Sequence, residues 1–93
     1  MAIEHVPGRK AGHIMLYALS TCGWCRKTKQ LLDELGVEYD YEYVDQLQGE
    51  KREEVMATVR SCNSRCTFPT LVMNNGKCII GYQEDEIRKA VEQ

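Results

Sequence analysis

The hydrophobic period changes abruptly near residue 20, and this change leaves few architectures open to the chain. His13 to Leu19 is a short apolar run, typical of a strand that is buried on both faces. From Trp24 onward, apolar residues recur at helical spacing, with three leucines between residues 31 and 35, and Gly36 provides a C-terminal cap. A strand that leads directly into an amphipathic helix predicts a β-α-β unit with a right-handed crossover and parallel strands.

The rest of the chain continues this alternation of strands and helices. Residues 38–45 alternate tyrosine with acidic residues and predict a second strand. Further on, the patterns predict a helix over 49–62, a hairpin of strands 70–73 and 77–80 around Asn74-Asn75-Gly76, and a helix over 84–91. The expected order is β-α-β-α-β-β-α, an α/β fold with a mixed four-stranded sheet flanked by helices.

The length of 93 residues predicts one domain. Residues 1–12 have no periodicity and contain Pro7 and Gly8, so they suit a solvated lead-in or a short edge segment. The domain proper is therefore expected over residues 13–93.

Composition excludes several classes of protein. A net charge of −2 without a basic stripe disfavours nucleic-acid binding, and no apolar run approaches the roughly 18 to 20 residues that span a bilayer. Five cysteines, an odd number, without an apolar export signal over residues 1–12, disfavour a secreted disulfide framework. We therefore expect a cytoplasmic protein whose thiols are reactive or metal-binding.

Cys22-Gly23-Trp24-Cys25 lies where the predicted strand ends and the helix begins. The free N–H groups and the positive end of the helix dipole favour negative charge on the first sulfur, so Cys22 is expected to be partly or mostly thiolate at neutral pH. A thiolate attacks disulfides, and Cys25 is close enough to displace the resulting mixed disulfide. The pattern predicts a thiol-disulfide oxidoreductase with Cys22 as nucleophile and Cys25 as resolving residue, needing no cofactor.

The alternative is a module that binds a metal through thiolates, either zinc or an iron-sulfur cluster bridged between two copies of the chain through Cys22. Cys22 and Cys25, with Cys62 and Cys66 as a second pair, superficially resemble a four-thiolate zinc arrangement. Zinc pairs usually lie on tight knuckles between short strands, whereas this pair opens a helix, so the redox interpretation is favoured and no metal is expected.

Several separated motifs resemble the glutaredoxin family of the thioredoxin superfamily, and in part the glutaredoxin-like hydrogen donors of ribonucleotide reductase. These motifs cover nearly the whole chain from residue 13. They are Cys22-Gly23-Trp24-Cys25, Thr67-Phe68-Pro69-Thr70, Gly76-Lys77 and Gly81-Tyr82-x-x-Asp85. The resemblance implies a thioredoxin-like fold, a cis peptide bond at Pro69 and a disulfide substrate.

The resemblance also implies where the substrate lies. The backbone of Phe68 would face the reactive sulfur and pair with an extended substrate. The residues expected to bind substrate are Gly23, Trp24, Thr67, Phe68, Pro69, Gly81 and Tyr82. Trp24 is interpreted as a partly exposed apolar platform beside the thiol. Such a groove would accept disulfides of proteins or of low-molecular-weight compounds.

The electron donor stays open. Leu19 stands where glutathione-using members carry Lys or Arg, and Ile80 to Asp85 keeps part of their Gly-Gly and acidic pattern. The candidate donors are a small thiol such as glutathione or a flavin-dependent disulfide reductase. A monomer is expected.

The surplus cysteines carry two further expectations. Cys62 and Cys66 are candidates for a second redox function, either by bridging each other or by Cys66 reaching Cys25 or substrate. Cys78 is interpreted as a small buried hydrophobe. His5 and His13 are not expected to act as bases.

Overall fold

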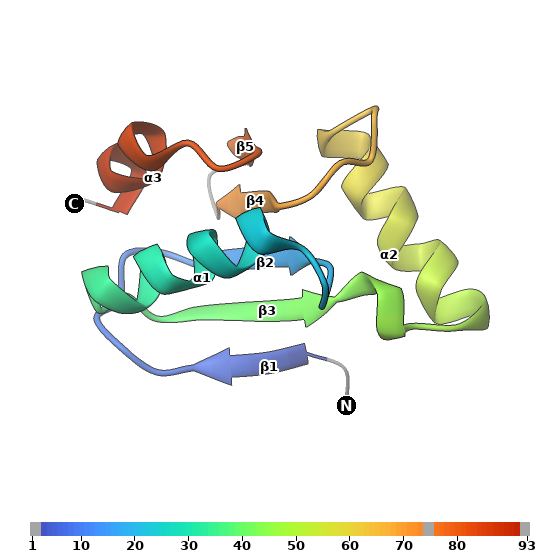
Figure 1. Ribbon diagram of the computed structural model, residues 1–93, viewed down its shortest axis with the longest axis horizontal. Coiled ribbons are helices and arrows are strands. Elements are labelled where there is room, and N and C mark those ends of the chain that lie inside the picture. The colour runs from blue at the N-terminus through green and yellow to red at the C-terminus, as the bar shows by residue number, and fades with distance from the viewer. Residues whose placement is uncertain (1–2, 74–75, 92–93) are drawn as a thin grey trace.

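The computed structural model describes residues 3–73 and 76–91. These residues form strands, α-helices and a 3-10 turn (η1) in an order that Figure 1 shows from blue to red. Their bounds are β1 (Ile3–Val6), β2 (Ile14–Ala18), α1 (Gly23–Leu35), β3 (Tyr39–Tyr43), η1 (Val44–Gln46), α2 (Gly49–Cys62), β4 (Thr70–Met73), β5 (Cys78–Ile80) and α3 (Glu84–Val91).

The predicted β-α-β-α-β-β-α order is confirmed from β2 onward, and the predicted sheet of four strands is corrected. Within the described residues the sheet has five strands in the order β1-β3-β2-β4-β5. β2 and β3 are parallel, as the crossover through α1 requires, and the other neighbours are antiparallel. The sheet is therefore mixed, and β1 and β5 are its edge strands.

The additional strand is β1, which lies within the segment 1–12 and pairs antiparallel with β3. Its residues Ile3, Glu4 and His5 are exposed, so they carry no alternation that a sequence pattern could reveal. The chain continues along the sheet edge through backbone hydrogen bonds from Arg9 N to the Gly36 carbonyl (2.7 Å) and from Glu38 N to the Arg9 carbonyl (2.8 Å).

Helices cover both faces of the sheet, and Figure 1 shows α2 apart from α1 and α3. On one face, leucines of α1 and Ile87 of α3 pack against Ile14 and Leu16 of β2. On the other face, Val55 and Val59 of α2 pack with Val44 and Leu47, against which Tyr17 and Phe68 rest. Successive residues of β2 thus point to opposite cores, which explains why this strand is apolar throughout.

The ends of α1 place the cysteine pair. Cys22 is the N-cap residue with extended backbone, and Gly36 ends the helix in the left-handed region (φ 68°). A glycine tolerates that conformation without the steric cost that a Cβ brings. Within the described residues, none of the helices has the length and apolar character needed to cross a bilayer. Asn74 and Asn75 of the predicted hairpin turn lie outside the described residues.

Candidate active site

Cys22 lies at the end of the β2–α1 loop with its sulfur against the first turn of α1. The backbone N–H of Cys25 donates a hydrogen bond to Cys22 Sγ over 3.2 Å. The first turn of α1 contains no acidic residue, so no neighbouring negative charge within it opposes the helix dipole. Cys22 is half-buried, which leaves its sulfur accessible to an incoming disulfide.

Cys25 differs from Cys22 in burial and in ionisation. Its side chain is 3% exposed and belongs to the core beneath α1. Burial, followed by the hydrogen bond with Cys22 and the charges of Cys22 and Asp45, raises the pKa of the Cys25 thiol to about 12. Cys25 is therefore a protonated thiol at neutral pH, held within reach of Cys22.

A groove of about 190 Å³ opens beside the pair. Five of the residues predicted to bind substrate line it together, although they come from three separate parts of the chain: Trp24, Phe68, Pro69, Gly81 and Tyr82. The Phe68–Pro69 peptide bond is cis, as the family resemblance implies. Gly81 N–H donates to the Pro69 carbonyl over 2.9 Å, which joins the last two segments.

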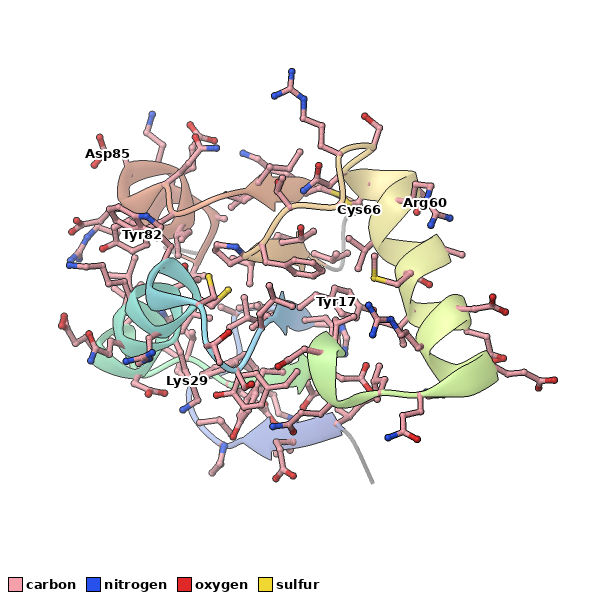
Figure 2. All side chains as sticks on the ribbon, turned by 45° about the vertical axis from the view of Figure 1, so that its right-hand side comes forward. Tyr17, Lys29, Arg60, Cys66, Tyr82 and Asp85 are labelled. Atoms are coloured by element: carbon pink, nitrogen blue, oxygen red, sulfur yellow. A yellow bond between two sulfur atoms is a disulfide. The ribbon has the colours of Figure 1, made fainter. Side chains whose placement is uncertain are left out.

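Trp24 forms the exposed wall of this groove. Its side chain is 59% exposed and stacks on the Tyr82 ring with the ring centroids 5.7 Å apart. Figure 2 shows Tyr82 beside the first turn of α1. Lys27 Nζ lies 5.8 Å from the centroid of the Trp24 ring, so a cation flanks the platform.

The loop that carries Phe68 is held by hydrogen bonds from the Asn63 side chain. The Asn63 side chain is buried, and its Nδ2 donates to the Thr67 carbonyl (3.0 Å), Thr67 Oγ1 (2.9 Å) and Thr70 Oγ1 (3.1 Å). Next to Thr67 in the chain, Phe68 has its carbonyl oxygen 4.0 Å from Cys22 Sγ. Of the residues predicted to bind substrate, Gly23 and Thr67 do not line the groove. Thr67 instead takes part in the hydrogen-bond network that holds the loop.

A second, more enclosed cavity of about 120 Å³ touches both Cys22 and Cys25. Residues that sequence reasoning did not assign to the site line it, among them Ser20, Arg26 and Tyr43. Ser20 N–H donates to Asp45 Oδ1 (2.9 Å), and the Ser20 hydroxyl bonds the same carboxylate. These bonds lower the pKa of Asp45, so its negative charge is maintained near Cys25. Asp45 closely follows β3, which is parallel to β2. Its position after this strand is the sequence signal that could have placed it near the cysteine pair.

The remaining cysteines pair differently from the prediction. Cys62 forms a disulfide with Cys78, not with Cys66, and Cys78 is half-buried, not a simple core residue. Cys66 is a free thiol with positive φ (53°), and Figure 2 places it at the loop after α2. It lines neither the groove nor the enclosed cavity as far as the described residues go. Cys62 bonds Cys78 and leaves Cys66 free, because the β4–β5 hairpin brings Cys78 to the end of α2.

This pairing also bears on the zinc alternative. Cys62 is bonded to Cys78, so it does not join Cys22, Cys25 and Cys66 in one thiolate cluster. Among residues 3–73 and 76–91, no group of three His, Cys, Asp or Glu side chains is arranged to hold a metal ion.

The fold and the site together define a thioredoxin-like protein with a cysteine pair at the start of its first helix. The sequence model of the glutaredoxin family, described as Glutaredoxin, matches residues 14–79. The chain belongs to the glutaredoxin family. An uncharacterized glutaredoxin-like 8.6 kDa protein encoded in the rubredoxin operon of Clostridium pasteurianum is 31% identical over 86% of this chain and 99% of its own.

Solved structures agree with this assignment. A glutaredoxin from Methanosarcina mazei Go1 is 45% identical with a TM-score of 0.92, over 100% of this chain and 90% of its own. Methanoredoxin from Methanosarcina acetivorans is 42% identical with a TM-score of 0.88, over 92% of this chain and 90% of its own. The thioredoxin-like fold predicted from sequence is thereby confirmed.

Proposed function

We propose that the protein is a dithiol oxidoreductase in which Cys22 attacks a disulfide and Cys25 resolves the mixed disulfide. The contrast between the two sulfurs carries the proposal. Cys22 is accessible and accepts an N–H hydrogen bond at the helix start, whereas Cys25 is buried and protonated. Membership of the glutaredoxin family supports this kind of activity.

In the first step, Cys22 Sγ attacks one sulfur of a substrate disulfide. A Cys22–substrate S–S bond forms, the substrate S–S bond breaks, and the second substrate sulfur leaves as a thiolate that takes up a proton from solvent. The helix N-terminus stabilises negative charge on Cys22 before the attack.

In the second step, Cys25 loses its proton and attacks Cys22 Sγ. The Cys22–Cys25 disulfide forms, the Cys22–substrate S–S bond breaks, and the first substrate sulfur leaves as a thiolate that takes up the proton lost by Cys25. Two electrons have then passed from the protein to the substrate. The hydrogen bond and charge of Cys22 both raise the pKa of Cys25. Because both causes disappear when Cys22 enters the mixed disulfide, Cys25 becomes easier to deprotonate at that point.

The groove favours disulfides carried on extended polypeptides or on small molecules. The Phe68 carbonyl faces Cys22, and Trp24 and Tyr82 offer a stacked aromatic wall to an apolar substrate group. The two-electron donor that restores the dithiol is proposed to be a low-molecular-weight thiol such as glutathione or a flavin-dependent disulfide reductase. We place the reaction in the cytoplasm and assign it to a monomer.

Trapping tests the assignment of the two roles. Cys25→Ser should accumulate mixed disulfides on Cys22 when the protein is offered a peptide disulfide, as seen in intact mass. Cys22→Ser should lose exchange activity. Cys66→Ser is the matched control, because it removes a free thiol outside the groove, and it should exchange at the wild-type rate. Retained exchange in Cys22→Ser would refute the proposal.

A further inference from the structure

The Cys62–Cys78 disulfide links α2 to the edge strand β5. Cys62 is the last residue of α2, and Cys78 is the first residue of β5. The two Cα atoms are 6.0 Å apart, although the residues are 16 positions apart in the chain. The bridge therefore ties the end of a helix on one face of the sheet to the edge of the sheet itself.

Both sulfurs belong to half-buried residues, unlike the buried Cys25. β5 is the terminal strand in the sheet order, so no further strand covers Cys78 from that side within the described residues. A small thiol in solution can therefore approach this bridge without unfolding the core.

The disulfide brackets the loop that forms the groove. The loop starts at Asn63, directly after Cys62, and runs to β4, which is paired with β5. Asn63 N–H donates to the Val59 carbonyl (2.7 Å), while its side chain bonds Thr67 and Thr70. Both ends of the loop are thus fixed relative to each other by the bridge and by Asn63.

The loop leads from the bridge to the reactive sulfur. Asn63 directly follows Cys62 in the chain, and its side chain donates to the Thr67 carbonyl. The carbonyl of the next residue, Phe68, lies 4.0 Å from Cys22 Sγ. Without the bridge, the end of α2 would lose its covalent link to β5, and the hydrogen bonds of Asn63 would have to hold it near β4 alone. The Phe68 edge of the groove would then be less well positioned for an attacking geometry, in which small displacements are costly.

We propose that Cys62–Cys78 is a second, reversible redox couple that low-molecular-weight thiols reduce, and that its oxidised state positions the 63–69 loop for exchange at Cys22. Two thiol groups, from two monothiol molecules or from one dithiol, convert the bridge to two cysteine thiols and themselves become one disulfide, so two electrons enter the protein. The same small disulfide reverses the reaction. The effect on exchange rests on the function proposed above, whereas the second couple itself does not.

A redox titration tests the couple. The protein is equilibrated in mixtures of reduced and oxidised dithiothreitol, thiols are blocked with iodoacetamide, and the pairs are mapped by peptide mass. We expect two separate transitions, one for Cys22–Cys25 and one for Cys62–Cys78, with a folded circular-dichroism spectrum throughout. The couple is overturned if Cys62 and Cys78 remain bonded until denaturant is added, or if they remain alkylatable in excess oxidised dithiothreitol.

Exchange rates test the coupling. Cys62→Ser/Cys78→Ser should exchange a peptide disulfide at Cys22 about two- to thirtyfold more slowly, the range expected when a positioning network is loosened. Cys66→Ser, in the same loop, should keep both transitions and the wild-type rate. An unchanged rate in the folded double variant would overturn the coupling.

Two further comparisons keep the result unambiguous. If the double variant does not fold, the Cys22→Ser/Cys25→Ser variant is used instead, because it keeps Cys62 and Cys78. This variant is reduced, its thiols are blocked with iodoacetamide, and amide exchange over residues 63–69 is compared between the bridged and the reduced, blocked forms. Faster amide exchange in the reduced form supports the coupling and equal exchange overturns it. Because this background lacks the dithiol, the second couple is judged separately from the proposed activity: loss of all exchange at Cys22 in wild-type protein would refute that activity and leave the titration result standing.

Discussion

Cys22 and Cys25 are three residues apart and are placed in different chemical environments by one helical turn. The N-cap position leaves Cys22 half-buried, whereas Cys25 faces the core with Leu31 and Leu32. Cys22 precedes the helix and has extended backbone, whereas Cys25 lies inside its first turn and is buried, so the two side chains differ in solvent exposure. The pKa of Cys25, raised to about 12 mainly by burial, is the measurable consequence.

Alkylation should therefore separate the two thiols in the reduced protein. Iodoacetamide at pH 7 should modify Cys22, while Cys25 should react appreciably only as the pH approaches its raised pKa, because the thiol and not the thiolate is present below it. The measurement is peptide mass mapping over pH 6 to about 10 in a Cys66→Ser background, which removes a competing free thiol. Equal modification of Cys22 and Cys25 at pH 7 would contradict the assignment of roles.

Trp24 gives a prediction that separates binding from stability. Since its side chain is 59% exposed, Trp24→Ala should change the free energy of unfolding by about 0.5 kcal/mol or less. Loss of the stacked platform should raise KM for an aromatic peptide disulfide about tenfold, as truncation of an aromatic anchor does. Trp24→Phe, which can still stack on Tyr82, is the control, and an unchanged KM in Trp24→Ala would exclude a platform role.

At the scale of elements, the N-terminal strand β1 is attached by charge as well as by its ladder. His5 Nδ1 bonds Asp40, and His5 Nε2 lies 2.8 Å from Glu38 Oε2, so the ring faces a carboxylate on each side. His13 Nε2 lies 3.5 Å from Asp40 Oδ2, and Lys10 lines a pocket together with both histidines and both carboxylates. The hydrogen bond to Asp40, ahead of the charges of both carboxylates, raises the pKa of His5 above 6.5.

The docking of β1 should consequently weaken with rising pH. A raised histidine pKa stabilises the folded form fully below the unfolded value near 6.5, and this contribution is lost as the pH passes the higher folded value. Amide-exchange protection of Ile3–Val6, corrected for intrinsic rates, should be higher at pH 6 than at pH 8.5. His5→Gln should abolish the difference, and protection that stays constant in the wild type would contradict it.

Most elements could be predicted because their signals are local. The bounds of α2 and α3 and the cap at Gly36 follow from periodicity and glycine chemistry, and the structure places them as predicted. β1 carries no such signal, since it is short, exposed and stabilised by pairing with a strand far along the chain. Glu42 was expected to be the polar member of an alternation, yet it is 1% exposed, because β3 is a central strand of the sheet.

The site shows the same division between local and long-range information. Cys22, Cys25 and the groove residues were recognised through motifs, and the structure brings five of the groove residues together. The partner of Cys62 could not be inferred, because sequence proximity favours Cys66 while the hairpin delivers Cys78. The parallel pairing of β2 with β3 was predicted, but no motif marked Ser20 and Asp45, which follow these two strands, as hydrogen-bond partners.

For the molecule as a whole, 93 residues leave little stability in reserve. The radius of gyration of 12.3 Å equals the value of about 12 Å expected for a compact domain of this length. Within the described residues, the hydrophobic core is divided by the sheet into a larger cluster under α1 and α3 and a smaller one under α2. The smaller cluster has few members, so α2 depends more than α1 on other attachments.

The Cys62–Cys78 bridge is such an attachment, and its effect on global stability can be anticipated from chain entropy. Closing a loop across 16 residues should lower the entropy of the unfolded chain enough to stabilise the fold by about 3 kcal/mol. In urea titrations, Cys62→Ser/Cys78→Ser should lose about this free energy of unfolding, whether the Cys22–Cys25 pair is oxidised or reduced. Cys66→Ser should lose far less, since that thiol is free. A double variant as stable as the wild type would show that α2 is held by its apolar contacts and that the bridge contributes nothing to global stability.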